Sequence, residues 1–302
     1  MQLKRKLEAG LPVVTVEISP PQGTDAASFL QHAHALKGLV DAINVPDCQL
    51  SILKMSSMAA SKLIQDATGI EAVWQLTCRD RNLIALQADL LGGYALGLRN
   101  VLALTGDPVQ IGDQKELAKQ VFHLESVRLL DLLHDLNKGH DACGKPFRQS
   151  GTQFTVGAAL NPFKLSNRAQ HLRLQQKMER HVDFFQTQPV YDIAAVERMQ
   201  DLLHTLAGQN GYPIPKVLIG IIPPRNADMA RRMNQQIVGV NIPDSFIDIL
   251  DRSDSPLEES IRYCADIVRS LAPRVDGFHF MPVGMPSKIP QLLSACFDTV
   301  PQ

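Results

Sequence analysis

Residues 71–108 read EAVWQLTCRDRNLIALQADLLGGYALGLRNVLALTGDP, and this stretch contains the pattern that decides the fold. Two apolar runs, Glu71 to Cys78 and Asn100 to Gly106, have the composition of buried strands. The segment between them, Asn82 to Leu96, has the composition of a helix. Because such runs are apolar without strict alternation, both faces of the strands are expected to be covered, as in a parallel sheet. The stretch therefore predicts a β-α-β unit.

The same alternation recurs about eight times, which is the rhythm of a barrel of strands and helices. The remaining strands are expected at residues 13–20, 41–47, 153–160, 182–188, 216–224 and 276–283. The remaining helices are expected at residues 24–36, 57–68, 126–137, 167–180, 192–207, 226–237, 258–271 and 287–297. We predict an α/β fold, a single (β/α)8 TIM barrel over residues 1–302, with its active site at the carboxyl ends of the strands. A doubly wound sheet with fewer units is the alternative.

The composition of the 302-residue chain argues against several classes of protein. The 45% of hydrophobic residues can form one substantial core, and the net charge of −1, without a basic face or tail, argues against a nucleic-acid partner. Five scattered cysteines without CxxC spacing, and histidines without ligand spacing, predict neither a disulfide framework nor a metal site. The basic N-terminus is not followed by a long apolar run, so we expect a cytoplasmic protein without membrane association.

Polar residues at the predicted strand ends would meet at one mouth of the barrel. They are Glu17, Asp47, Thr77 with Arg79 and Asp80, Asp107, Asn161, Gln188 and His279. Glu17 is the most informative, because a carboxyl group inside an apolar strand must be paired or neutral. A raised pKa would make Glu17 a general acid near neutral pH, whereas a buried pair with Arg or Lys would give it a structural role. The strand alone favours neither interpretation.

Other polar residues could contact a ligand. Asp107 follows the fourth strand, where Gly106 permits close backbone approach, although an ordinary turn has the same sequence. Gln188 can donate and accept hydrogen bonds without titrating, or it is a satisfied polar group near the core. Lys177 lies four residues after Arg173, and the two could neutralise a phosphate or form a solvated helix face. The chain has no GxGxxG, Walker, HExxH or GxSxG sequence, so a dinucleotide would bind without the Rossmann fingerprint.

Six short segments lie in a fixed order along the predicted strands. They are VEISPP (16–21), QLTCRDRN (75–82), ALTGDP (103–108), FFQTQPVYD (184–192), GIIPPRN (220–226) and GFHFMPV (277–283). With these segments the chain resembles the methylenetetrahydrofolate reductase family, FAD-containing barrel enzymes of one-carbon metabolism. It is most similar to the reductase part of bacterial proteins that are fused to a homocysteine methyltransferase. The resemblance extends over nearly the whole chain.

The resemblance implies a ping-pong reaction in which NADH or NADPH reduces FAD and methylenetetrahydrofolate is then reduced to methyltetrahydrofolate. Glu17 matches the general acid that helps open the five-membered ring of the folate, Asp107 the carboxylate beside flavin and pterin, and Gln188 the amide that hydrogen-bonds the folate. The residues that would surround FAD are Gln75, Thr105, Gly106, Asp107, Phe122, His123, Asn161, Arg173 and Lys177. Of these, Lys177 would contact the diphosphate. Each role agrees with the chemistry of its side chain.

The sequence also departs from some members of the family. These members have His where Gln75 stands, Arg where Thr105 stands, and near Ala227 an aromatic residue that stacks on the nicotinamide. An alternative is therefore the same catalytic subunit supplied with electrons by a partner protein. A non-redox pterin-binding or methyl-transfer subunit is a further alternative. Family members commonly self-associate, so a homo-oligomer is compatible with the resemblance.

Overall fold

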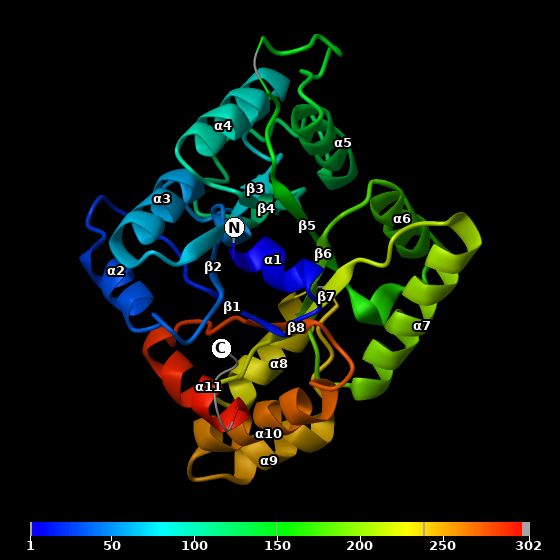
Figure 1. The fold of residues 1–302 in the computed structure, drawn as a ribbon. Coiled ribbons are helices and arrows are strands. Elements are labelled where there is room, and N and C mark those ends of the chain that lie inside the picture. The colour runs from blue at the N-terminus through cyan, green and yellow to red at the C-terminus, as the bar shows by residue number, and fades with distance from the viewer. Residues whose placement is uncertain (1, 149, 238, 298–302) are drawn as a thin grey trace.

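The computed structural model describes residues 2–148, 150–237 and 239–297. Its parallel strands form a closed barrel in sequence order, and β1 completes the ring by pairing with β8 (Figure 1). The strands are β1 (Val13–Glu17), β2 (Ala42–Val45), β3 (Glu71–Thr77), β4 (Asn100–Leu104), β5 (Thr155–Leu160), β6 (Phe184–Pro189), β7 (Lys216–Ile221) and β8 (Gly277–Phe280). The predicted (β/α)8 barrel is confirmed, and the closed ring contradicts the doubly wound alternative.

Helices surround the barrel (Figure 1). They are α2 (Ala27–His34), α3 (Ser57–Thr68), α4 (Leu83–Ala95), α5 (Ser126–Asn137), α6 (Arg168–Glu179), α7 (Ile193–Asn210), α8 (Ala227–Gln236), α9 (Asp244–Arg252), α10 (Pro256–Leu271) and α11 (Ile289–Cys296). Several begin where a short polar side chain accepts a hydrogen bond from the first turn, as N-caps do. These caps are Asn82 before α4, Asn167 before α6, Asp192 before α7 and Asn226 before α8.

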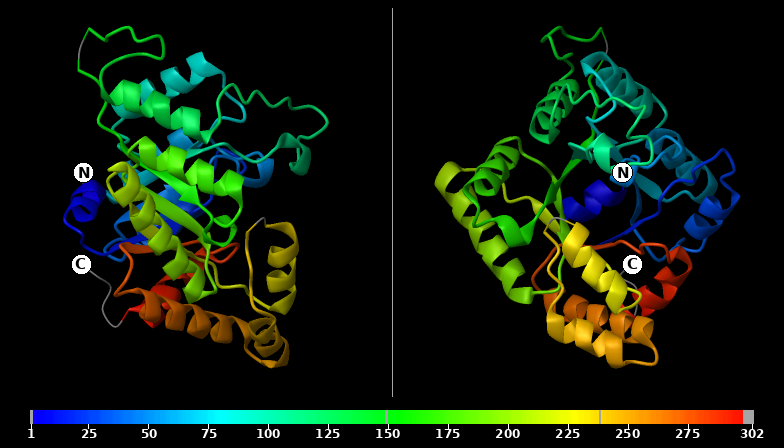
Figure 2. Two further views of the ribbon diagram at one scale, coloured as in Figure 1. Left: turned by 90° about the vertical axis from the view of Figure 1, so that its right-hand side faces the viewer. Right: turned by 180° about the vertical axis from the view of Figure 1, so that it is seen from behind.

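A short N-terminal helix, α1 (Gln2–Glu8), was not expected from the sequence. It lies at the centre of the ring of strands in Figure 1 and closes the end of the barrel opposite the mouth (Figure 2, left). Leu3 and Leu7 of α1 pack against apolar side chains inside the barrel, among them Phe184 and Leu218. The backbone N–H groups of Gln2 and Leu3 donate to the carboxylate of Glu71. With two buried leucines, α1 is too short to show a helical period in the sequence.

The second unexpected element is α9, formed by part of a segment that the sequence left unassigned. Phe246, Ile247 and Leu250 of α9 are buried, and the helix contacts α8 and α10. Most strands also end earlier than expected: β1 ends at Glu17, β7 at Ile221 and β8 at Phe280. The residues beyond these points are mostly apolar. Ile18 and Met281 still donate to the neighbouring strands, and the chain then turns away to form the mouth. Among the described residues, no helix has both the length and the apolar character that crossing a bilayer requires.

Polar side chains fill the middle of the barrel, between the apolar end closed by α1 and the mouth. Asn44 Nδ2 donates to Gln186 Oε1 at 2.7 Å, and Gln186 Nε2 donates to Thr15 Oγ1 at 3.4 Å. Thr15 Oγ1 also lies 2.9 Å from His279 Nδ1. These four residues are buried. The layer therefore forms the floor of the mouth, directly below Glu17.

Candidate active site

The carboxyl ends of the strands bring the three predicted catalytic residues to one mouth. Glu17 is the last residue of β1, Asp107 follows β4, and Gln188 lies near the end of β6. The long segment between β4 and α5, which contains η2 (Val109–Ile111), extends outward from this mouth (Figure 2, left). The three residues therefore lie together at the end of the barrel that carries the active site in TIM-barrel enzymes.

Glu17 is half-buried, and its side chain lines a pocket. Burial raises the pKa of Glu17 to about 7 from its ordinary value of 4.5. Gln75 Nε2 donates a 2.9 Å hydrogen bond to Glu17 Oε2, which acts in the opposite direction by stabilising the carboxylate. Among the described residues, no Arg or Lys forms an ion pair with Glu17. This argues against the structural interpretation and leaves a group that can gain or lose a proton near neutral pH.

Asp107 is held by a tight turn of the segment after β2. Leu50 N–H donates to Asp107 Oδ2 at 2.6 Å, and Ser51 Oγ donates to the Asp107 carbonyl at 2.9 Å. The backbone φ angles of Cys48, Leu50 and Ser51 are 49°, 54° and 55°, values that non-glycine residues rarely adopt. Arg79 Nη1 donates to the Cys48 carbonyl and to Ser51 Oγ, at 3.0 Å and 3.1 Å. A strained turn fixed by Arg79 therefore orients the Asp107 carboxylate.

Gln188 stands at an irregularity of the barrel. The register between β6 and β7 shifts between Gln186 and Pro189, as at a β-bulge. Thr187 Oγ1 accepts from the Gly220 N–H at 2.8 Å and donates to the Gln188 carbonyl at 2.8 Å, which fixes the backbone here. The half-buried side-chain amide of Gln188 has no hydrogen-bond partner within the described residues. It is therefore free to bind a ligand, as bulged residues near sites often are.

Three of the predicted FAD residues line one narrow cavity of about 20 Å³: Asn161, Arg173 and Lys177. Lys177 Nζ donates to the Ala159 carbonyl at 2.6 Å. Burial, with the neighbouring charge of Arg173, lowers the pKa of Lys177 to about 8. Arg173 forms an ion pair with Glu125 at 2.6 Å, but no carboxylate within the described residues bonds to Lys177. A buried ammonium beside a guanidinium fits an anionic group such as a diphosphate, and Lys177 is not part of a solvated face.

Thr105 and Gly106 connect the end of β4 to the mouth. Thr105 Oγ1 accepts a 3.1 Å hydrogen bond from the Ser126 N–H at the start of α5. Gly106 has a φ angle of 97°, and a Cβ there would lie 2.9 Å from Thr77 Cβ. A side chain at position 106 would therefore clash with β3, which explains the glycine in the TGDP segment.

Phe122 and His123 lie on the segment between β4 and α5. The Val121 and Phe122 N–H groups both donate to the Arg79 carbonyl, at 2.7 Å and 3.3 Å, and Phe122 has a φ angle of 40°. His123 is exposed. Arg79 therefore fixes two segments of the mouth, one through its side chain and one through its carbonyl.

Two polar residues expected at the mouth, Asp47 and His279, instead form contacts with other residues of the barrel. Asp47 is buried, and its Oδ2 accepts from Thr77 Oγ1 at 2.8 Å and from Arg81 Nη1 at 2.7 Å. His279 lies inside the barrel against Thr15, where burial lowers its pKa to about 3 and keeps it neutral. Both residues stabilise the barrel, and their position at strand ends did not distinguish this role from a catalytic one.

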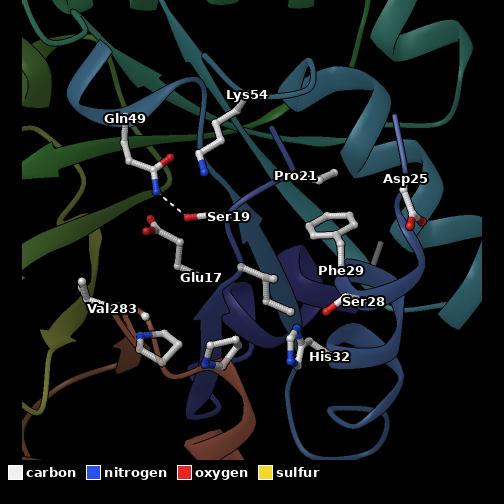
Figure 3. Close-up of a pocket in the computed structure, with 14 residues that line it drawn as sticks. Glu17, Ser19, Pro21, Asp25, Ser28, Phe29, His32, Gln49, Lys54 and Val283 are labelled. Carbon is white, nitrogen blue, oxygen red and sulfur yellow. Dashed lines mark hydrogen bonds between the residues drawn. The ribbon is translucent and has the colours of Figure 1, made fainter. Parts of the chain in front are cut away.

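Glu17 lines a pocket of about 450 Å³ between β1, α2, the segment after β2 and the segment after β8 (Figure 3). Its wall is apolar at Phe29 and Pro282, and Gln49 Nε2 donates to Ser19 Oγ on another side. Lys54 also lines this pocket. Sequence reasoning did not identify Lys54, because its segment has no regular period and no recognisable motif.

One protein family matches nearly the whole chain. The sequence profile of a family described as "Methylenetetrahydrofolate reductase" matches residues 2–296. Two Schizosaccharomyces pombe proteins, "Methylenetetrahydrofolate reductase 2" and "Methylenetetrahydrofolate reductase 1", are 23% and 26% identical to the chain over 256 and 242 residues. The matches cover 78% and 76% of this chain but only 37% and 36% of those proteins. The chain therefore spans little more than a third of the length of these relatives.

A solved structure shares the fold over almost the whole chain. It is an uncharacterized protein from Clostridium thermocellum that binds two copies of 5-methyl-5,6,7,8-tetrahydrofolic acid. The TM-score is 0.72 at 16% sequence identity, and the match covers 99% of this chain and 98% of that one. At this identity the similarity concerns the fold.

Proposed function

The chain belongs to the methylenetetrahydrofolate reductase family, and we propose that it reduces methylenetetrahydrofolate to methyltetrahydrofolate with FAD as cofactor and NADH or NADPH as electron donor. The observation that carries this proposal is Glu17, a half-buried carboxyl group that lines a pocket, with a pKa of about 7 and no cationic partner among the described residues. The names of the yeast relatives and the folate bound by the Clostridium thermocellum protein support folate as the substrate class. A cytoplasmic location, expected from the sequence, is part of the proposal, and a homo-oligomer is compatible with the resemblance.

Glu17 would act as the general acid. Opening the five-membered ring of methylenetetrahydrofolate requires a proton on the departing ring nitrogen. A carboxyl group with a pKa of about 7 is partly protonated at neutral pH and can supply that proton. The hydrogen bond from Gln75 fixes the direction of the carboxyl group. Substrate would reach Glu17 through the pocket that Glu17 lines.

Asp107 and Gln188 would stabilise and orient the opened folate. Opening the ring leaves a positive charge on the folate, and the Asp107 carboxylate, oriented by Leu50, can stabilise it. The free amide of Gln188 can donate to and accept from the pterin ring. The two residues would have different roles: the carboxylate would stabilise the positive charge on the folate, and the amide would orient the pterin ring.

The residues present fit FAD. Bound FAD would take a hydride from the nicotinamide and deliver it to the folate. Lys177 and Arg173 would neutralise its diphosphate, next to Asn161 in the same cavity. Gln75, Thr105, Gly106, Asp107, Phe122 and His123 would complete the contacts along the ends of β3 and β4 and the segment that follows.

An anaerobic absorbance experiment on the FAD-loaded chain tests the proposal. NADH or NADPH is added first, and methylenetetrahydrofolate second. The flavin band should bleach and then return, which reports both half-reactions in one cuvette. A chain that binds no FAD would overturn the proposal. If the nicotinamides fail to bleach the flavin, but chemically reduced flavin is reoxidised by the folate, then the electron donor is a partner protein.

A further inference from the structure

Lys54 is a cation at the mouth that no step above uses. It lies between η1 (Gln49–Ser51) and α3, is half-buried, and lines the pocket that Glu17 also lines. Figure 3 shows its amine directed into this pocket. Within the part of the chain that the structure describes, the ammonium has neither a hydrogen-bond acceptor nor an ion-pair partner.

Other cations near the mouth are paired. Arg79 forms an ion pair with Asp80 at 2.7 Å. Arg81 forms one with Asp47 at the same distance. Withdrawing an ammonium partly from water without giving it an acceptor is unfavourable. A bound anion would therefore stabilise the Lys54 ammonium more than it would stabilise these paired arginines.

The acidic groups of the same pocket do not neutralise Lys54. Asp25 Oδ1 accepts a 2.9 Å hydrogen bond from the Ala27 N–H at the start of α2. Glu17 accepts from Gln75, and its pKa of about 7 leaves it largely protonated in mildly acidic solution. Neither carboxyl group forms an ion pair with Lys54. The third titratable residue of the pocket, His32, provides a ring that can donate to an anion but carries no negative charge.

We propose that Lys54 binds a carboxylate at the glutamyl end of the folate substrate. The inference rests on the proposed function, since it takes the folate as the ligand whose reactive ring meets Glu17. A folate carries its reactive pterin at one end, an aromatic linker in the middle, and glutamyl carboxylates at the other end. The pocket offers matching surfaces: the acid Glu17, apolar walls at Phe29 and Pro282, and the ammonium of Lys54.

The chemistry of lysine suits this role. Its ammonium is a compact charge on a flexible stem, so it can follow a carboxylate whose position varies. Lys54 is half-exposed, and solvent will weaken the attraction. We therefore expect an effect on affinity of about tenfold, at the lower end of the range for hydrogen bonds to charged groups.

Equilibrium titration of the FAD-loaded chain with two ligands tests the proposal. One ligand is 5-methyltetrahydrofolate, and the other is 6-methyltetrahydropterin, which has the same ring but no glutamyl tail. Lys54→Met should weaken binding of the folate about tenfold and leave binding of the pterin unchanged. Lys54→Arg should recover most of the folate affinity. Raising the salt concentration should reduce the difference between wild type and Lys54→Met, because salt screens half-exposed charges.

Lys37→Met is the matched control, since Lys37 is exposed and follows α2 at the opposite end of the barrel. It should bind both ligands as wild type does. Equal weakening of both ligands by Lys54→Met, or no change in either, would overturn the assignment of Lys54 alone. Loss of affinity for NADH or NADPH instead of the folate would overturn it as well. If the wild-type chain binds neither the folate nor the pterin, the proposed function itself fails.

Discussion

The backbone N–H of Leu50 donates a 2.6 Å hydrogen bond to Oδ2 of Asp107, joining the turn after β2 to the end of β4. The turn holds this geometry although Cys48, Leu50 and Ser51 all have positive φ angles. Such conformations cost on the order of 1–3 kcal/mol each in non-glycine residues and persist where surrounding contacts impose them. Here the side chain of Arg79 supplies these contacts. The fixed direction of the Asp107 carboxylate is what this arrangement maintains.

Ser51→Ala tests whether the turn matters for catalysis. The change removes the hydroxyl that donates to the Asp107 carbonyl and accepts from Arg79. We expect a loss of stability of about 1 kcal/mol, and a folate half-reaction slowed by roughly tenfold because the carboxylate loses its direction. The first is measured by thermal unfolding and the second by rapid mixing of reduced enzyme with methylenetetrahydrofolate.

Leu50→Gly is the control for the turn, because glycine keeps the N–H that Asp107 accepts and tolerates the φ angle of 54°. Its folate half-reaction should stay within about twofold of wild type. A Ser51→Ala variant with normal kinetics would show that the turn serves stability only.

Glu17→Gln separates the two half-reactions. The amide keeps the size of the side chain and its ability to hydrogen-bond Gln75, but it cannot donate an acidic proton. We expect reduction of the flavin by NADH to be preserved and reduction of the folate to fall by about 10²- to 10⁴-fold, the usual contribution of a general acid. Stopped-flow absorbance of the flavin band measures each step. A folate step at the parental rate would exclude Glu17 as the acid.

The pH dependence of the folate half-reaction should follow the protonation of Glu17. The rate should be high below pH 7 and should fall as pH rises through about 7, because the donor loses its proton. Stability changes in the same direction. The folded-state pKa is raised from 4.5, so the stabilising contribution is complete below pH 4.5 and is lost as pH rises through about 7.

Gln75→Met provides a check on this assignment, since it removes the hydrogen bond that lowers the pKa of Glu17. The midpoint of the pH–rate profile should then move to higher pH. A midpoint that stays in place, or moves to lower pH, would mean that another group controls the profile.

The fold could be predicted from the sequence because each β-α-β unit carries local signals. The strands are apolar, and helices such as α4 and α8 begin at residues whose side chains cap them, Asn82 and Asn226. Helix α1 lacked such a signal, because its place is decided by the apolar interior that Leu3 and Leu7 enter after folding. The local sequence pattern was sufficient to predict strands and helices whose buried residues recur at a regular spacing. It was insufficient to predict α1, a short helix that closes one end of the barrel.

The candidate site was predictable in part for the same reason. Glu17 could be identified because a carboxyl group inside an apolar strand is unusual, and its partner Gln75 lies on β3, two strands along the barrel from β1. The orientation of Asp107 depends on Leu50 and Arg79, which are distant from it and from each other in sequence. Lys54 becomes informative only when the structure places it in the pocket of Glu17, with no acidic partner in the described part of the chain. Contacts between residues far apart in the chain leave no local pattern in the sequence from which they could be predicted.

Lys177→Met should affect the empty and the FAD-loaded protein in opposite directions. Without the cofactor, a buried ammonium whose one hydrogen bond within the described residues goes to the Ala159 carbonyl is unfavourable, so Met should stabilise the apoprotein at neutral pH. The pKa of Lys177 is lowered to about 8, so the unfavourable contribution is present below about pH 8 and fades as pH rises toward the ordinary value of 10.5. The stabilisation by Met should fade over the same range.

The affinity of Lys177→Met for FAD should instead fall by about 10- to 100-fold, because the diphosphate loses a charge-assisted hydrogen bond. Thermal unfolding of the apoprotein at pH 7 and pH 10, together with a flavin-fluorescence titration, measures both effects. Lys177→Arg keeps the charge and should retain more FAD affinity than Lys177→Met. If Lys177→Met were destabilised without FAD and bound FAD normally, Lys177 would be a structural residue and the diphosphate would have to lie elsewhere. Opposite signs in the two measurements are the result that only an anion-binding lysine produces.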